Sequence, residues 1–79
     1  MFQIVRLTLD HNDDIIARRP LRPVFELRDD ALIMARHEAS GLWGDYGYDL
    51  KRHCWWGSDD RGWQYRFVVE EATAGDIAA

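Results

Sequence analysis

Four side chains in this sequence are of the types that bind zinc: the single cysteine, Cys54, and the histidines His11, His37 and His53. Tetrahedral zinc sites combine Cys and His ligands. His53 and Cys54 are adjacent, so on a β-strand they would point to opposite faces. No C-x-x-C or H-x-x-x-H pair occurs to bring two ligands to one side. The sequence therefore predicts no zinc site, and no other cofactor has a motif here.

The acidic segment 10–14, DHNDD, opens like a calcium-binding loop. Calcium takes oxygen ligands at alternate positions of a tight loop, with Gly at the sixth position and a bidentate Glu at the twelfth. Here those two positions hold Ile15 and Leu21. We therefore predict a turn whose short polar side chains bind the nearby backbone, and no metal.

Cys54 is also the only candidate nucleophile of the thiol type. A catalytic thiolate needs an adjacent base and an electropositive, partly exposed setting. His53 would face away from it, and His37 could approach only if a helix packs over the face that carries Cys54. A buried cysteine that packs as a small apolar residue is commoner. The chain also lacks G-x-S-x-G, P-loop and G-x-G-x-x-G motifs. We predict that it is not an enzyme, with catalysis by Cys54 and His37 as the weaker alternative.

The segment 54–65, CWWGSDDRGWQY, carries three of the four tryptophans around a Gly, Ser and Asp turn. Side chains alternate over residues 48–56 and again over 63–70, which predicts a β-hairpin with a loop at 57–62. Because opposite residues of a hairpin share a face, one set of side chains should point inward. That inward set comprises Trp56, Trp63, Tyr65, Phe67 and Val69, with Cys54 on the same side.

Trp55 then lies on the outer face of the hairpin, where it could contact a partner. Trp, Tyr and Arg are the usual anchors of protein interfaces, so we predict protein association or self-association through this face or through an exposed strand edge. The alternative is a single-stranded nucleic-acid-binding module, in which sheet aromatics stack on bases beside Lys51, Arg52, Arg61 and Arg66. The candidate interaction surface comprises Lys51, His53, Trp55, Gln64 and Arg66.

The N-terminal third of the chain predicts one strand and one long loop. Residues 2–9 alternate in part, which is typical of a strand covered on both faces. Pro20 and Pro23 withhold backbone donors, so residues 17–24 should be neither helix nor central strand. The expected loop runs from the turn at residues 10–14 to Pro23, and within it Ile15 and Ile16 are expected to reach the core.

One helix is predicted over residues 30–40, capped by Asp29 or Asp30 and ended by Gly41. The expected fold is α+β: a small antiparallel sheet of about three strands in β-α-β-β order, with the helix packed on one face. Residues 1–71 should form a single domain, and residues 72–79 a disordered C-terminal tail. The apolar stripe of the helix comprises Ala31, Leu32, Met34, Ala35, Ala39 and Leu42.

Composition and charge restrict the classes of function that fit this sequence. The 79 residues are 47% hydrophobic and 30% charged, with a formal net charge of −4. That charge opposes nucleic-acid binding, which draws on Lys and Arg. A single cysteine, no signal-peptide pattern and no apolar run of membrane-spanning length favour a cytoplasmic protein. We expect a small non-enzymatic domain, of the kind common among short bacterial proteins, that acts through protein association.

Overall fold

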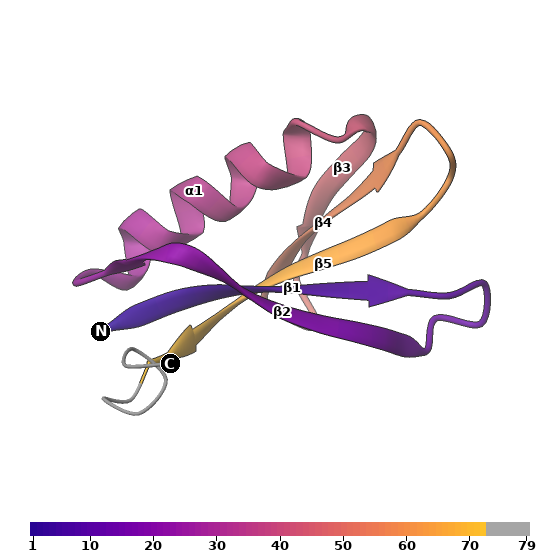
Figure 1. Cartoon of the computed structure of the whole chain (residues 1–79). Helices are drawn as coiled ribbons and strands as arrows, with labels where there is room; N and C mark the ends of the chain where they lie inside the picture. The colour runs from indigo at the N-terminus through magenta and orange to yellow at the C-terminus, as the bar shows by residue number, and fades with distance from the viewer. Residues whose placement is uncertain (73–79) are drawn as a thin grey trace.

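The computed structural model describes residues 1–72, which form one antiparallel sheet and one helix that crosses its concave face (Figure 1). The sheet has five strands in the order β2-β1-β5-β4-β3. Strands β2 and β3 are therefore the two edges. The elements are β1 (Phe2–Leu9), β2 (Ile15–Phe25), α1 (Arg28–Ser40), β3 (Trp43–Asp49), β4 (Cys54–Asp59) and β5 (Gln64–Glu71).

The predicted three-stranded sheet in β-α-β-β order is wrong, although the α+β class holds. Two strands are missing from that prediction. The segment interpreted as a loop before Pro23 is the 11-residue strand β2. The single strand expected over residues 48–56 is two strands, β3 and β4, joined by a turn at residues 50–53.

Strand β2 escaped prediction because of its prolines. A proline cannot donate to a β-ladder, so it is excluded from central strands but tolerated on an edge. Pro20 lies opposite Val5 of β1, and Pro23, which follows a cis peptide bond, lies where the register between the two strands shifts. Ile15 and Ile16 are 55% and 54% exposed, so the expectation that they reach the core is wrong.

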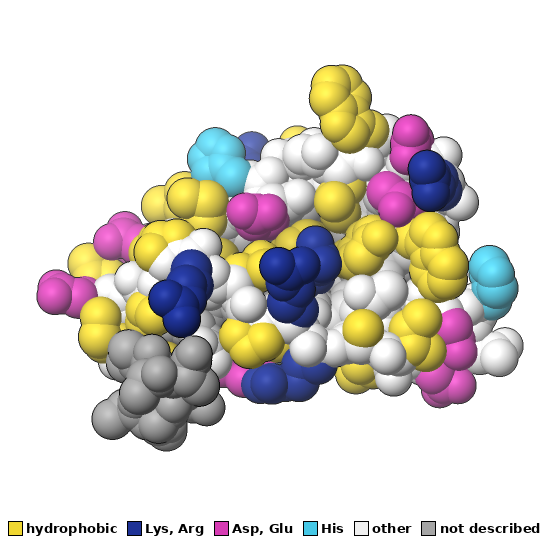
Figure 2. All heavy atoms as spheres, viewed as in Figure 1, with side chains coloured by type: hydrophobic (Ala, Val, Ile, Leu, Met, Phe, Trp, Pro, Cys, Tyr) yellow, Lys and Arg dark blue, Asp and Glu magenta, His cyan; other side chains and the backbone are white. Residues whose placement is uncertain are grey.

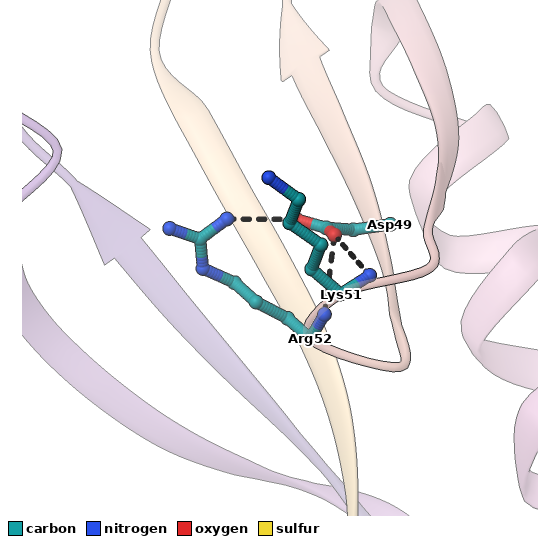
Figure 3. A network of polar contacts seen from close by, with 3 residues as sticks. All are labelled: Asp49, Lys51 and Arg52. Atoms are coloured by element: carbon teal, nitrogen blue, oxygen red, sulfur yellow. Dashed lines mark hydrogen bonds and ion pairs between the residues drawn. The ribbon is translucent and has the colours of Figure 1, made fainter.

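Asp49 makes the turn that separates β3 from β4 (Figure 3). Its Oδ1 accepts hydrogen bonds from the backbone N–H groups of Lys51 and Arg52, at 2.9 and 3.1 Å. Its Oδ2 accepts a bond of 2.9 Å from Nη1 of Arg52. Short polar side chains that bind the following backbone in this way favour turns over strands. The chain therefore reverses at residues 50–53, in the middle of the predicted strand.

Helix α1 begins two residues before its predicted start. Leu27 occupies the N-cap in an extended conformation and offers no side-chain cap, so the predicted capping by Asp29 or Asp30 is wrong. Both carboxylates instead lie in the first turn, where their negative charge interacts favourably with the positive end of the helix dipole. The helix ends as predicted at Gly41, whose N–H donates to the carbonyl of His37 at 3.0 Å.

The main core lies between the helix and the concave face of the sheet. Ala31, Ala35 and Ala39 are fully buried at i, i+4 spacing, so the helix presents small side chains to the sheet. Its last turn comes close to β4, where a Cβ on Gly57 would lie 2.7 Å from the carbonyl oxygen of Ala39. The core cluster contains Ile4, Ala31, Ala35, Ala39 and Phe67, with Phe2, Leu21, Phe25, Met34, Leu42, Trp55, Tyr65 and Val69 packed against it.

The opposite face of the sheet, here called the open face, carries no helix among residues 1–72 but still buries Val5, Leu9 and Cys54. Long side chains help to cover it. Arg18 of β2 forms an ion pair with Glu70 of β5. Because β1 lies between those two strands, this pair spans β1 on the open face.

The β1–β2 turn and the β4–β5 turn lie at the same end of the sheet, because β1 pairs directly with β5 (Figure 1). In the first turn, Oδ1 of Asp10 accepts hydrogen bonds from the N–H groups of Asn12 and Asp14 at 2.8 and 3.0 Å. The predicted self-capped turn is thus confirmed. Next to it, Trp63 stacks on His11 with ring centroids 6.3 Å apart and is 41% exposed, so its predicted place in the core is wrong.

The C-terminal end of β5 is held against the N-terminus. The N–H of Ala72 donates to the carbonyl of Met1 at 2.7 Å, and Ala72 is buried. The predicted disordered tail, apart from Ala72, lies outside the described residues. Among residues 1–72, no helix is long and apolar enough to cross a membrane.

Candidate association surface

The five residues of the predicted interaction surface do not come together. Lys51 and His53 belong to the β3–β4 turn. Gln64 and Arg66 lie on the open face of β5, opposite Ser58 and Trp56. Trp55 points the other way and packs against the core beneath the helix. A surface centred on Trp55 and Arg66 is therefore not formed, because the two side chains lie on opposite faces of the sheet.

Trp55 and Trp56 exchange the faces predicted for them, and the cause is the length of the hairpin loop. A six-residue loop at 57–62 would pair Trp56 with Trp63, whereas the structure pairs Gly57 with Tyr65 and Trp55 with Phe67. Moving a register by an odd number of residues sends every side chain to the other face.

Asp59 tightens that loop. Its Oδ1 accepts hydrogen bonds from the N–H groups of Arg61 and Trp63, at 3.0 and 2.9 Å. Its own N–H donates to the carbonyl of Trp63. Gly62 adopts a φ of +86°, which most other residues avoid. The strands therefore continue to Asp59, and the reversal takes fewer residues than predicted.

The edge strand β3 is a free sheet edge lined with aromatic side chains. It pairs with β4 on one side and with no strand on the other among the residues that the structure describes. Tyr46 and Tyr48 are 45% and 37% exposed on its concave side. In Figure 2, hydrophobic side chains reach the surface at the top of the view, where Figure 1 places the start of β3. Edges of this kind are templates for another strand.

On the open face, the ring of Trp56 lies across Gly47 of β3. A Cβ on Gly47 would lie 3.0 Å from the indole Nε1, so only glycine leaves room for this ring position. Trp56 is 36% exposed. The free edge is thus flanked by aromatic rings on both faces, by Tyr46 and Tyr48 on one and by Trp56 on the other.

A shallow groove of about 290 Å³ lies beside the edge on the concave side, between the helix and β4. Tyr48 meets the ring of Trp55 edge-on with centroids 5.3 Å apart, and the guanidinium of Arg36 lies 5.7 Å from the centroid of the Trp55 ring. Ile33, at the rim, is 58% exposed. The lining is therefore mainly apolar and could take the side chains of a strand added to β3. The groove is lined by Leu32, Ile33, Arg36, Tyr48 and Trp55.

Trp43, the first residue of β3, combines two unfavourable features. Its φ is +70°, a conformation that is a genuine outlier for a bulky side chain. It is also 90% exposed, the highest value among the exposed large hydrophobic residues. Strained backbone of this kind costs about 1 to 3 kcal/mol and gathers at functional sites. Trp43 thus holds a large apolar side chain in solvent at the start of the free edge.

The charges of the edge are acidic. Asp45 and Asp49 are the charged residues of β3, which contains no Lys or Arg. Arg52 pairs with Asp49, and its hydrogen bond lowers the pKa of that carboxyl below its usual value. Asp45 has no ion-pair partner within residues 1–72. A partner strand with positive side chains would complement this edge.

The geometry does not assemble the weaker catalytic alternative. Cys54 is 1% exposed on the open face, whereas His37 lies on the helix across the sheet. Burial raises the pKa of the Cys54 thiol, and the charge of Asp49 adds to that effect. Within the described part of the chain, no three His, Cys, Asp or Glu side chains gather where they could hold a metal ion.

Comparisons with protein-family models, with curated proteins and with solved structures found no match to this chain.

Trp43 and Tyr46 escaped prediction because the glycines beside them resemble a loop, whereas Tyr48 is expected only as the first residue of the strand over 48–56. Gly44 does mark an irregular position, since a Cβ there would lie 2.2 Å from the carbonyl oxygen of Ser58. The useful signal was the alternation of Tyr46 and Tyr48 with Asp49 at its end, because Asp followed by polar residues favours a turn.

Proposed function

We propose that this domain binds a partner protein by strand addition, in which an extended segment of the partner pairs with the free edge of β3. The observation that carries the proposal is the edge itself. It combines unpaired backbone with aromatic side chains on both faces. In strand addition the backbone supplies affinity, and pockets for alternate side chains supply specificity.

The expected partner segment alternates between apolar and basic residues. Side chains on the concave side would meet Tyr46 and Tyr48 and reach the groove beside Trp55. Those on the open face would meet the ring of Trp56 and the carboxylates of β3, where Lys or Arg is favoured by charge and by cation–π attraction. A second copy of this chain fits less well, because it would bring an acidic edge against an acidic edge.

A peptide titration tests this proposal. The probe is a blocked nine-residue peptide of alternating Val and Lys, followed by chemical shifts of backbone amides at low and moderate salt. We expect shifts confined to β3 and its groove. Replacing Lys by Glu in the peptide should weaken binding about tenfold or more, because attraction becomes repulsion.

Tyr48→Lys is the matched variant, since a lysine on an edge strand discourages pairing. It should abolish peptide binding and lower the free energy of unfolding by about 1 kcal/mol, because the edge-on contact with Trp55 is lost. Arg22→Lys on the other edge should leave peptide binding unchanged. Shifts that are absent, or equally large on β2, would contradict the proposal. Dimerisation of the protein alone that Tyr48→Lys removes would make a second copy the occupant and would also contradict it.

A further inference from the structure

The groove beside Trp55 leaves apolar surface open to solvent. Leu32 and Ile33 lie four and three residues before Arg36, so the three side chains share one side of helix α1 and form one wall. Tyr48 and Trp55, which are opposite each other on β3 and β4, form the sheet side. Ile33 is exposed, and Trp55 is only half-buried. Contiguous apolar surface of this kind marks sites of interaction.

Arg36 is the one charged residue that lines this groove in the described part of the chain. Its guanidinium lies over the indole of Trp55, 5.7 Å from the ring centroid. It has no ion-pair partner within residues 1–72. A guanidinium is planar and stacks on aromatic rings, so a second ring can pack against the face that Trp55 leaves free. The same positive charge disfavours a Lys or Arg in the groove.

The position of the groove restricts the side chains that can fill it. Tyr48 belongs to the edge strand, so it lies between Trp55 and any strand added to β3. A partner side chain must therefore extend past Tyr48. Diagonal neighbours on adjacent strands are about 7 to 8 Å apart, a distance that aromatic and other long side chains span. A valine there would reach no further than Tyr48.

The size and lining of the groove favour an aromatic ring among the long side chains. A cavity of about 150 Å³ holds benzene, so a groove of about 290 Å³ has room for one ring. Tyr48 and Trp55 meet edge-on with centroids 5.3 Å apart, and a third ring can pack on them in the same way. Its π face would also attract the guanidinium of Arg36, which an aliphatic side chain of equal size cannot do.

We propose that the groove binds one aromatic side chain, Phe, Tyr or Trp, from the partner segment that pairs with β3. This aromatic site rests on the proposed strand addition and supplies one specific side-chain position within it. The partner segment then carries an aromatic residue on the side that faces α1, and basic residues on the side that faces away.

The test uses four blocked nine-residue peptides that differ at one central Val of the Val-Lys sequence, which stays Val or becomes Phe, cyclohexylalanine or Glu. Cyclohexylalanine resembles Phe in size but has no π electrons. We expect the Phe peptide to bind about fivefold or more tightly than the Val peptide, and more tightly than the other two. Its ring current should also shift the indole N–H signal of Trp55 and the methyl signals of Ile33, which the other three peptides cannot do.

Arg36→Gln is the informative variant of the protein. It should remove most of the difference in affinity between the Phe and cyclohexylalanine peptides, because the cation–π attraction is lost, and it should keep binding of the Val peptide. Arg28→Gln is the matched control, since it removes one positive charge from the same helix at a position that does not line the groove. The difference between the two peptides should be unchanged in Arg28→Gln.

The peptides also separate this site from strand addition itself. If the Val peptide binds at β3 and the Phe peptide binds no more tightly, the aromatic site is overturned and strand addition stands. Cyclohexylalanine acting as well as Phe, or Glu acting better, would overturn the aromatic class of side chain in the same way. An equal loss in Arg36→Gln and Arg28→Gln would remove Arg36 from the site. If none of the peptides shifts the amides of β3, strand addition fails and the aromatic site fails with it.

Discussion

The two edge strands of this sheet are built in opposite ways. Strand β2 has 11 residues with two prolines and three arginines, whereas β3 has seven residues with three aromatic side chains, no proline and no cation. Prolines and positive charges are the usual means of preventing a sheet edge from pairing with another chain. The protein therefore blocks one edge against association and leaves the other open, which is what a domain that binds through one edge requires.

Part of β3 is nevertheless unsuited to pairing. The register with β4 shifts between Trp43 and Tyr46, and Oγ of Ser58 accepts a hydrogen bond of 3.0 Å from the N–H of Asp45. Bulges of this kind twist an edge and interrupt regular pairing. The regular part of the free edge of β3 is thus the segment 46–49, and Trp43 lies beyond the shift in register.

The largest expected effect comes from Trp43→Gly, which should stabilise the protein and at the same time weaken binding of the peptide. Glycine adopts positive φ without strain, and this gain exceeds its greater entropy in the unfolded chain, so the free energy of unfolding should rise by about 1 kcal/mol. Binding of the Val-Lys peptide should weaken about tenfold or more, as expected for the loss of a tryptophan anchor. Urea unfolding and peptide titration measure the two effects.

His53→Gly is the control for Trp43→Gly. His53 has a φ of +52° in the β3–β4 turn and does not lie on the edge. The same relief of strain should therefore stabilise the protein without changing peptide binding. If Trp43→Gly leaves peptide affinity intact, Trp43 is not an anchor and the edge proposal loses its strongest contact.

The second prediction removes the protection from β2. Pro20→Val restores a backbone donor, and Arg22→Val removes a positive charge from the same strand. The double variant should self-associate at protein concentrations on the order of hundreds of micromolar, since a long unprotected edge pairs with its own kind. Sedimentation velocity over a concentration series measures this, and the wild-type protein at equal concentration is the reference. A variant that stays monomeric would show that Pro20 and Arg22 are not what blocks this edge.

The helix and the strands β1 and β5 follow from sequence because each has one dominant pattern. Residues 2–9 alternate in part, residues 63–70 alternate more regularly, and Ala31, Ala35 and Ala39 mark one helical face. Strand β2 could not be recognised in this way. Its prolines exclude a central strand, and only the arrangement of the whole sheet makes it an edge.

The site was less predictable because it depends on register. The alternation of side chains along a strand places Trp55 and Trp56 on opposite faces of the sheet. Which face each one takes depends on the length of the next turn, which Asp59 and Gly62 set. A loop longer or shorter by an odd number of residues exchanges them.

The smallest expected effect concerns the turn that holds the open edge. The pKa of Asp49 lies below its usual value of 3.8, mainly because its side chain accepts a hydrogen bond from Arg52. A carboxyl whose pKa is lower in the folded state adds stability that is present above pH 3.8 and is lost as the pH falls below it. In Arg52→Gln this pKa should move back toward 3.8, so the loss of stability on acidification should become shallower.

Arg18→Gln, on the β2 side, should leave this pKa unchanged. Urea midpoints between pH 2 and 6, with the Asp49 carboxyl carbon followed by NMR, measure both effects. An Asp49 titration that is the same in Arg52→Gln and in the wild type would show that backbone donors alone hold the carboxylate. The end of β3 would then be held by the backbone hydrogen bonds of the turn and not by the side chain of Arg52.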